Sequence, residues 1–413
     1  MGRGLVACGA THGVMERCNF ACTSCYLTEI ANAVRPLPFA EVKRQLDALR
    51  DYLGPAGKAQ ITSGEVTLLS MEELGRIVTY ARSIGLDPMV MTNGERFLDE
   101  ADYLLVLVRD HGLQKVAIHI DSTQRGRKGM PAEATERGIR PIRDRFAALV
   151  REVRAQTGKK LHAAQTVTVT ERNLHEIPSV MRSVLDHVDA FRMVSFQPSA
   201  QVGRTLDGPA DDLTLDAVWE QICSGVGLPL NRDAMRFGHP ECNIVCPMVV
   251  VSFAGRQRIV ESVREVNGWD LRIVQKIMDI FGNLVVVGAP RLESRLRILS
   301  LLLRNPAFLL EAPLYALYRV WGVRSWLARA LFHVATLRIR PLAIIVHKFM
   351  SPDELDTRLG RERLRACAFK VPVNGSMVSM CEMNATDLRR SLNEEMRASS
   401  IADSEPPLAA SAF

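Results

Sequence analysis

The sequence predicts an α/β fold built on a parallel sheet. In the first two hundred residues, short apolar or β-branched runs alternate with amphipathic helical patterns, and each run stops at a turn-like or polar residue. Such alternation calls for helical crossovers between parallel strands, in an open doubly wound sheet or a whole or partial barrel. Periodicity alone does not choose between these. The expected strands are Lys58–Thr62, Pro88–Met91, Lys115–Ile120, His162–Val169 and Phe191–Phe196.

The expected helices follow from apolar spacing and from their end signals. Apolar residues three and four apart between Phe39 and Leu53, ended by Gly54, predict an amphipathic helix. Ser70 and Glu73 form the pattern of a capping box before the next helix, and Asn173 with Glu176 opens another in a similar way. The Gly- and Arg-containing stretch 122–139 is expected to be a loop, either at an active-site strand end or on the solvated surface.

The second half of the sequence has a different pattern. Val249 to Val263 alternates like a hairpin around Ala254-Gly255, after a helical pattern from Leu213 to Val226. Nine arginines lie between Arg291 and Arg340 in an apolar helical pattern, which fits either a membrane-surface region or a packed helical bundle. The expected division is 1–207 core barrel, 208–268 linker helix and hairpin, 269–350 Arg-rich helical region, 351–396 cysteine-bearing region and 397–413 disordered tail.

Composition narrows the class of protein. The 413 residues are 47% hydrophobic and 24% charged, which excludes collagen-like, disordered and disulfide-miniprotein classes. A net charge of +6 over this length is mild and argues against a nucleic-acid-binding protein. Met1 to Ala10 lacks the pattern of a secretory signal, so the expected location is cytoplasmic, at the inner face of the membrane if the arginines meet lipid.

Nine cysteines in a reducing compartment are expected to be ligands or core residues. Cys18, Cys22 and Cys25 form a C-x3-C-x2-C motif upstream of the first helix. Three thiolates can hold three irons of a [4Fe-4S] cluster and leave the fourth iron open for a substrate or cofactor. A zinc site using His12 or Cys8 is the alternative, but the spacing fits no common zinc pattern.

This motif, with Tyr26 beside its last cysteine, resembles the cluster loop of the radical S-adenosylmethionine (SAM) superfamily. Ile61-Thr-Ser-Gly-Glu65 stands where that family has a Gly-Gly-Glu motif that holds the amino group of SAM, with Ser63 replacing the first glycine. The resemblance covers roughly residues 5 to 205 and implies a partial (β/α)6 barrel of the TIM type. The SAM contacts it implies are Tyr26, Ser63, Gly64, Glu65, Asn93, Asp121, Gln165, Gln197 and Arg204.

The resemblance also implies a mechanism. An electron from a low-potential donor such as a ferredoxin or flavodoxin reaches the cluster and then SAM, which cleaves to methionine and a 5′-deoxyadenosyl radical. That radical takes a hydrogen atom from an unactivated C–H bond, while the protein positions the reactants and excludes water.

Four further cysteines are arranged as two separated pairs. Cys242 and Cys246, with Cys367 and Cys381, can supply a second metal site, either an auxiliary [4Fe-4S] cluster or one iron or zinc ion. The segments around Lys348-Phe-Met, Cys367 and Cys381 resemble the subgroup that contains archaeal tetraether lipid synthase and the cobalamin-independent class D methylases.

Three functions remain open on this basis. The first is hydrogen abstraction from a lipid or apolar substrate, with peripheral association with a membrane. The second is a methylase or other C–C bond-forming enzyme that acts on a soluble small molecule or a peptide. The third is a non-catalytic iron–sulfur membrane adaptor, which a vacant iron position argues against.

Overall fold

The computed structural model describes residues 7–131, 133–208, 213–235, 237–253, 256–261, 263–264, 267–281, 291–321 and 338–402. Its centre is an eleven-stranded sheet in the order β11-β10-β1-β2-β3-β4-β5-β6-β9-β7-β8. All neighbours from β10 to β9 pair in parallel, and the outer strands pair antiparallel. The parallel strands are β1 (Cys8–Ala10), β2 (Lys58–Ile61), β3 (Asp87–Thr92), β4 (Lys115–His119), β5 (His162–Val169), β6 (Phe191–Pro198), β9 (Arg338–His347) and β10 (Phe369–Val373).

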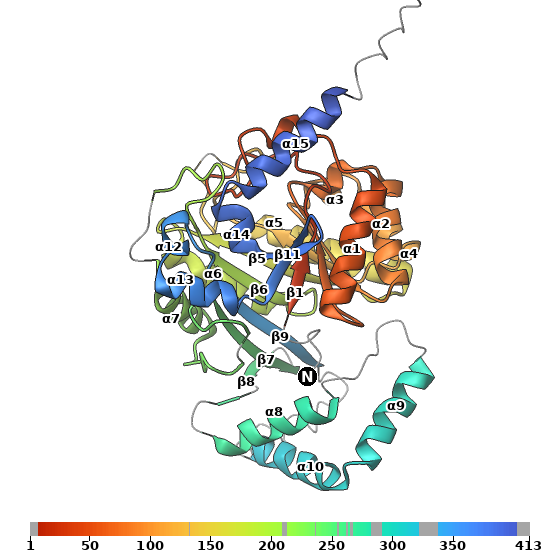
Figure 1. Ribbon diagram of the computed structural model, residues 1–413. Helices are drawn as coiled ribbons and strands as arrows, with labels where there is room; N and C mark the ends of the chain where they lie inside the picture. Colours follow the sequence, from red (N-terminus) through yellow and green to blue (C-terminus); the bar gives the residue numbers. More distant parts are fainter. Residues whose placement is uncertain are drawn as a thin grey trace, which may run out of the picture.

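The sheet curls into a partial barrel, as predicted, with helices along its outer side (Figure 1). Strands β1 to β6 form the expected six-stranded core, in chain order, with helical crossovers between them. The helices are α1 (Phe39–Leu53), α2 (Met71–Ser83), α3 (Glu95–Asp99), α4 (Ala101–Arg109), α5 (Arg140–Thr157), α6 (Ile177–Asp186) and α7 (Leu215–Val226), with short 3-10 turns at Ala31–Ala33, Val66–Leu68 and Leu174–Glu176.

Local end signals explain most helix boundaries. The apolar face of α1 buries Leu46, Leu49 and Leu53 against the sheet. The predicted capping box forms, since the Ser70 hydroxyl accepts from the Glu73 N–H and Glu73 accepts from the Ser70 N–H. A helical segment also begins directly after Asn173, as predicted, but without a capping box. The Asn173 side chain instead accepts from the Thr170 N–H and donates to Ser122, Glu136 and Thr168.

Two strands from the second half extend the barrel at its edges. β9 lies beside β6, and β10 lies beside β1, so segments far apart in sequence flank the six-stranded core. The expected helical region 269–350 therefore ends before Arg338, where the chain forms a strand whose Leu342, Ile344 and Val346 are buried. The predicted hairpin is present as β7 (Asn243–Phe253) and β8 (Arg256–Glu261), and β7 pairs with β9.

The Arg-rich region forms a helical lobe below the barrel, made of α8 (Gly268–Phe281), α9 (Arg291–Leu303) and α10 (Pro306–Trp321) (Figure 1). Buried Asp270 ties this lobe to the hairpin segment, because it accepts from Arg264, Tyr315 and Arg319. Arg319 also donates to the Glu261 carbonyl at the end of β8. No helix in the described residues is long and apolar enough to cross a membrane.

The C-terminal segment returns to the start of the barrel. It comprises α12 (Pro352–Leu355), α13 (Arg358–Arg365), β10, β11 (Ser376–Ser379), α14 (Met380–Ala385) and α15 (Leu388–Ala402). On α15, buried Arg389 forms an ion pair of 3.1 Å with buried Glu16, which lies just before the cysteine motif. Residues 397–402 of the expected disordered tail thus belong to a helix, and 403–413 lie outside the described residues.

Candidate functional site

The predicted cluster loop lies at the carboxyl ends of the barrel strands and lines a cavity of about 770 Å³ of non-atom space, counted with its open mouth. Most predicted cofactor contacts line this one cavity, together with residues from the ends of β2 to β6. The lining includes Cys18, Cys22, Cys25, Tyr26, Ser63, Gly64, Glu65, Asn93 and Gln197.

The three thiols of the motif are partly buried and close enough to influence one another. Burial raises the pKa of the Cys18 thiol to about 11. Burial, with Asp121 and the other two cysteines, raises the pKa of Cys22 well above its ordinary value. The Arg204 guanidinium donates to the Cys25 sulfur at 3.4 Å and to the Phe20 carbonyl at 3.2 Å. The chain thus gathers three thiols beside one fixed cation.

The strand end Ser63-Gly64-Glu65 packs directly on the segment before Cys18. A Cβ on Gly64 would lie 2.2 Å from the Glu16 carbonyl oxygen, so only glycine permits this approach. The Ser63 carbonyl accepts from the Tyr26 hydroxyl, whereas the buried Ser63 hydroxyl has no hydrogen-bond partner in the described part of the chain. A buried hydroxyl in a cavity wall without a partner is a fitting contact for a polar ligand.

Glu65 has a different arrangement from the one expected. Its carboxylate accepts from the Thr67 N–H and hydroxyl, the Thr92 hydroxyl and the Asn93 N–H, at 2.5 to 3.0 Å. Four donors occupy the acceptor positions that a carboxylate offers. Glu65 therefore joins the ends of β2 and β3, and the partners it already has leave little capacity for a ligand ammonium.

Three predicted contacts, Asp121, Gln165 and Arg204, do not line the cavity, although Arg204 donates to the Cys25 sulfur in its wall. Alternate residues of a strand face opposite sides of the sheet, and on β5 it is Thr166 and Thr168 that line the cavity, while Gln165 is fully buried. Its side-chain carbonyl has no partner in the described residues. The prediction that Gln165 faces the cofactor is therefore wrong in this geometry.

Asp121 lies behind the cavity wall and contacts residues that line it. It contacts His119 Nε2 and accepts from the Thr123 N–H and the Thr168 N–H. Although burial opposes ionisation, His119 and these hydrogen bonds lower the pKa of Asp121. His119 lines the cavity and was missed from the sequence, although its place two residues before Asp121 on an alternating strand is a usable signal.

The first part of the stretch 122–139, up to Arg127, packs against the cysteine loop, whereas most described residues from Lys128 to Gly138 are exposed. The Arg125 carbonyl accepts from the Ala21 N–H and the Thr123 carbonyl accepts from the Thr23 N–H, both at 2.9 Å. Buried Arg127 lies over the Phe20 ring at 5.0 Å. This loop therefore holds the cysteine loop from the side opposite to Gly64.

No family model matches the chain. The 7,8-dihydro-6-hydroxymethylpterin dimethyltransferase of Methanocaldococcus jannaschii is 27% identical over 194 residues, which are 46% of this chain and 36% of that protein. The C-x3-C-x2-C loop stands at the strand ends of a parallel barrel, with its three thiols on one cavity. The motif and its place at the strand ends are those that the sequence resemblance to the radical SAM superfamily implies. The chain spans about a third of the length of that curated relative.

Solved radical SAM structures are similar at a low level. Streptococcus suis SuiB bound to S-adenosylmethionine is 14% identical, with a TM-score of 0.40 over 54% of this chain and 48% of SuiB. Coproporphyrinogen III oxidase (HemN) from Escherichia coli, a radical SAM enzyme, is 12% identical, with a TM-score of 0.34 over 65% of this chain and 58% of HemN.

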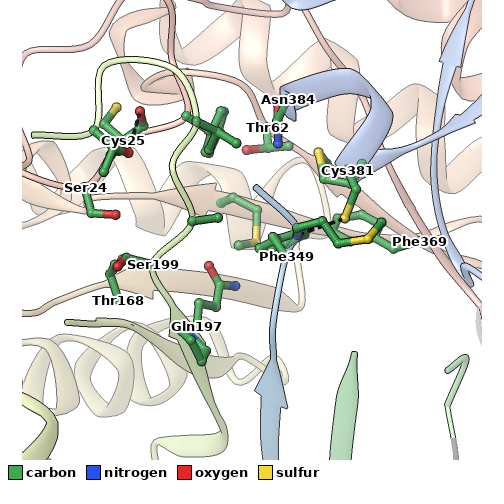
Figure 2. Close-up of a pocket in the computed structure, with 18 of the residues that line it drawn as sticks. Ser24, Cys25, Thr62, Thr168, Gln197, Ser199, Phe349, Phe369, Cys381 and Asn384 are labelled. Carbon is green, nitrogen blue, oxygen red and sulfur yellow. Dashed lines mark hydrogen bonds between the residues drawn. The ribbon is translucent and has the colours of Figure 1, made fainter. Parts of the chain in front are cut away.

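A second cavity of about 770 Å³, again counted with its mouth, adjoins the first. Both cavities are lined by Cys25, Tyr26, Thr62 and Gln197, so they share a wall. Figure 2 shows Cys25 on one side, Cys381 on the other, and Gln197 pointing into the space between them. Among the described residues, the lining contains no Asp, Glu, Lys or Arg. Its apolar part comprises Met91, Pro198, Ala200, Val202, Phe349, Met350, Phe369 and Met380.

Three of the four predicted auxiliary cysteines come together in a third, smaller cavity. Cys242, Cys367 and Cys381 line it, with His239 and His347. Arg363 donates to the Cys242 sulfur at 3.2 Å, and the Met350 N–H donates to the Cys381 sulfur at 3.4 Å. Burial raises the pKa of all three thiols, that of Cys381 to about 12. Cys381 lines both this cavity and the second one.

The prediction that Cys246 joins this group is wrong. Cys246 lies within β7, pairs with Ile344 of β9 and is fully buried in the core between sheet and helices. Strand alternation directs it to the face opposite Asn243, which lines the cavity. Its ionisable neighbours are Glu261 and Cys223. Across the described ranges, no three His, Cys, Asp or Glu side chains converge closely enough to hold one metal ion.

Proposed function

We propose that this chain is a radical SAM enzyme and that it abstracts a hydrogen atom from an unactivated C–H bond of a lipid or other apolar substrate. The substrate would lie in the second cavity, between the cysteine motif and Cys381. The observation that carries this proposal is the wall shared by the two cavities, since it joins the predicted cofactor site to an uncharged, largely apolar pocket.

Cys18, Cys22 and Cys25 would hold a [4Fe-4S] cluster, one thiolate to each of three irons. When bound, the cluster supplies the electron that cleaves SAM reductively. The donor set fits, because three thiols converge on one cavity beside Arg204, whose charge offsets that of a thiolate-bound cluster. The unpartnered Ser63 hydroxyl in the same wall is a ready acceptor for the SAM ammonium group.

The surrounding residues would position the reactants and exclude water. Glu65 fixes the ends of β2 and β3, and Tyr26 ties the cysteine loop to Ser63. Arg389 of α15 lies over the Tyr26 ring at 4.8 Å and so helps to fix the ring. The Phe20 carbonyl and the Cys25 sulfur accept from the Arg204 guanidinium and hold it in place. These contacts need no rearrangement when a reaction occurs.

The lining of the second cavity supports an uncharged substrate. Transfer of a charged group from water into an apolar pocket is costly unless the pocket supplies a partner, and this lining supplies none. The amides of Gln60, Gln197 and Asn384 and the hydroxyls of Ser24 and Ser199 can orient a neutral polar group. An apolar chain bearing an ester, ether or amide meets these conditions.

The helical lobe supports contact with a membrane surface. Nine large apolar side chains on α8, α9 and α10 are exposed, a density that soluble surfaces seldom show. They are Leu271, Ile277, Leu296, Ile298, Leu299, Leu303, Leu309, Leu310 and Leu314. Arg297 lies on α9 and Arg304 directly follows its end, and both suit anionic headgroups. The proposed location is the cytoplasmic face of a membrane, where a ferredoxin or flavodoxin would supply electrons.

Cys242, Cys367 and Cys381 would hold a second iron–sulfur cluster in place of the four-cysteine site expected from the sequence. The chemistry of the donor set supports this, since three thiols share a cavity and Arg363 donates to one sulfur. Because Cys381 also lines the second cavity, a cluster there would be next to the substrate.

Hydrogen transfer from a labelled lipid tests this function. The reconstituted enzyme would receive SAM, dithionite and polar lipids purified from cells grown on perdeuterated medium, and 5′-deoxyadenosine would be analysed by mass spectrometry. We expect deuterium in the 5′-deoxyadenosine. Deuterium transfer from the aqueous metabolite fraction, and none from the lipids, would contradict the proposal.

That contrary result would favour a methylase that acts on a soluble small molecule. The name of the curated relative supports this second candidate, since that protein is a pterin dimethyltransferase. Its product would carry a new methyl group whose carbon can be followed with isotopically labelled SAM.

A further inference from the structure

The second cysteine cavity has three thiols, whereas a [4Fe-4S] cluster has four irons. We propose that His347 is the fourth ligand of the cluster in this cavity and that Asn243 positions it. This inference rests on the second cluster proposed above. His347 takes the ligand position that was predicted from the sequence for Cys246, because strand alternation places Cys246 on the other face of the sheet.

His347 is held in the cavity wall by its neighbours. It is the last residue of β9 and pairs with Asn243, which directly follows Cys242 in the chain. Its ring centroid lies 4.4 Å from that of Phe349 and 5.7 Å from that of Phe369. Within the described part of the chain, burial and the charge of Arg363 act on the His347 ring but no hydrogen bond engages its nitrogens, so a lone pair is available to a metal.

The other histidine of this cavity, His239, already accepts a hydrogen bond with its ring nitrogen lone pair. Its Nδ1 accepts from the Glu241 N–H at 3.1 Å. A neutral imidazole that accepts at Nδ1 carries its proton on Nε2, which then has no lone pair for a metal. The hydrogen bond therefore distinguishes the two histidines.

Asn243 provides a second, independent observation. Its side-chain nitrogen donates to the Phe237 carbonyl at 2.8 Å, which orients the amide, yet its buried Oδ1 has no partner in the described residues. Among the residues that line this cavity, it is the one side chain with such an orphaned buried atom. Paired residues on adjacent strands project to the same face. Asn243 Oδ1 can thus accept the remaining proton of a metal-bound His347, the contact that usually orients such a ligand.

Pulsed EPR on the full-length chain tests the assignment. A variant with Cys18→Ala, Cys22→Ala and Cys25→Ala removes the first cluster, so that the reduced second cluster gives the only cluster signal. For this triple variant we expect about four irons per chain. We also expect its EPR signal to show a nitrogen-14 hyperfine coupling typical of a directly bound imidazole. Adding His347→Phe, which keeps an aromatic ring, should remove the coupling. Adding Asn243→Leu should keep the iron but change the coupling and the reduction potential.

His239→Ala and Cys8→Ala are matched controls. Cys8 is close enough to Cys367 to raise its own pKa, but it does not line the cavity. Both controls should keep the nitrogen coupling. Four irons without nitrogen coupling, loss of coupling in His239→Ala, or loss of the cluster in Cys8→Ala would overturn the assignment of His347. A triple variant without iron would instead overturn the second cluster itself.

Discussion

Cys25 and Cys381 line opposite sides of one cavity, although Cys25 lies in the loop after β1 and Cys381 lies on α14 near the end of the chain (Figure 2). The pairing of β10 with β1 brings them together, because it places the C-terminal segment beside the first strand of the barrel. A substrate in this cavity would contact the walls of both proposed cluster sites.

A negative charge in this cavity should impair hydrogen transfer. Ser199 lines the cavity, is only partly buried, and its backbone N–H donates to the Val169 carbonyl, so its side chain can change without loss of that contact. We expect Ser199→Asp to reduce deuterium transfer from lipid about tenfold or more, because a charge in an apolar pocket is costly. The Ser199→Asn variant has almost the same shape and should retain most activity. Equal losses in both variants would mean that size, and not charge, matters there.

Loading of the first cluster should depend on pH. Burial holds the pKa of Cys18 near 11 and that of Cys22 well above its ordinary value, so both thiols are protonated in the apo protein at neutral pH. Each thiol that binds iron as a thiolate releases a proton. The apparent affinity for ferrous iron should therefore rise with pH between about pH 6.5 and 8.5, a range in which even an ordinary thiol is mostly protonated. Iron titration of the apo protein across this range measures the effect. An affinity that is independent of pH would contradict it.

Arg204 should tune the reduction potential of the first cluster. Its guanidinium donates to the Cys25 sulfur, and a cation that hydrogen-bonds a cluster ligand stabilises the reduced state. We expect Arg204→Met to lower the midpoint potential, measured by EPR-monitored redox titration, and Arg204→Lys to restore part of the difference. The exposed Arg390→Met is the control. An unchanged midpoint potential in Arg204→Met would show that Arg204 does not tune the cluster.

The exposed leucines of the helical lobe should support binding to vesicles. Leu299, Leu303 and Leu310 are 50%, 65% and 73% exposed. Because burial of a leucine contributes about 1.5 to 3 kcal/mol, their joint replacement with glutamate should weaken binding to anionic vesicles by at least about tenfold. Leu206→Glu, at a position 81% exposed on the barrel side of the chain, should leave binding unchanged. If the lobe variant sedimented with vesicles as strongly as the wild-type chain, the lobe would instead be a packed helical bundle.

Local patterns could predict the barrel core and the first cysteine loop. Cys18, Cys22 and Cys25 lie in one loop, so their spacing alone places them together, and β1 to β6 follow each other in chain order. The edges could not be predicted in this way, because the partners of β9 and β10 are far away in the sequence.

Side-chain direction limited the prediction of the site. Gln165 and Cys246 belong to the correct strands but face the core, since a shift of one residue moves a side chain to the other face of a sheet. His119 and His347 lie on the cavity-facing side and were missed. Glu65 was placed correctly, but only the structure shows that four donors already occupy its carboxylate.

The most direct test of the central proposal is the formation of 5′-deoxyadenosine from SAM by the anaerobically reconstituted enzyme, compared with its Cys22→Ala variant. We expect the wild-type chain to bind about eight irons and form 5′-deoxyadenosine with dithionite. The variant should bind about four irons fewer and form none, while Cys246→Ala, outside both cysteine groups, should behave as wild type. Continued formation of 5′-deoxyadenosine by Cys22→Ala would contradict the assignment of the catalytic cluster to this loop.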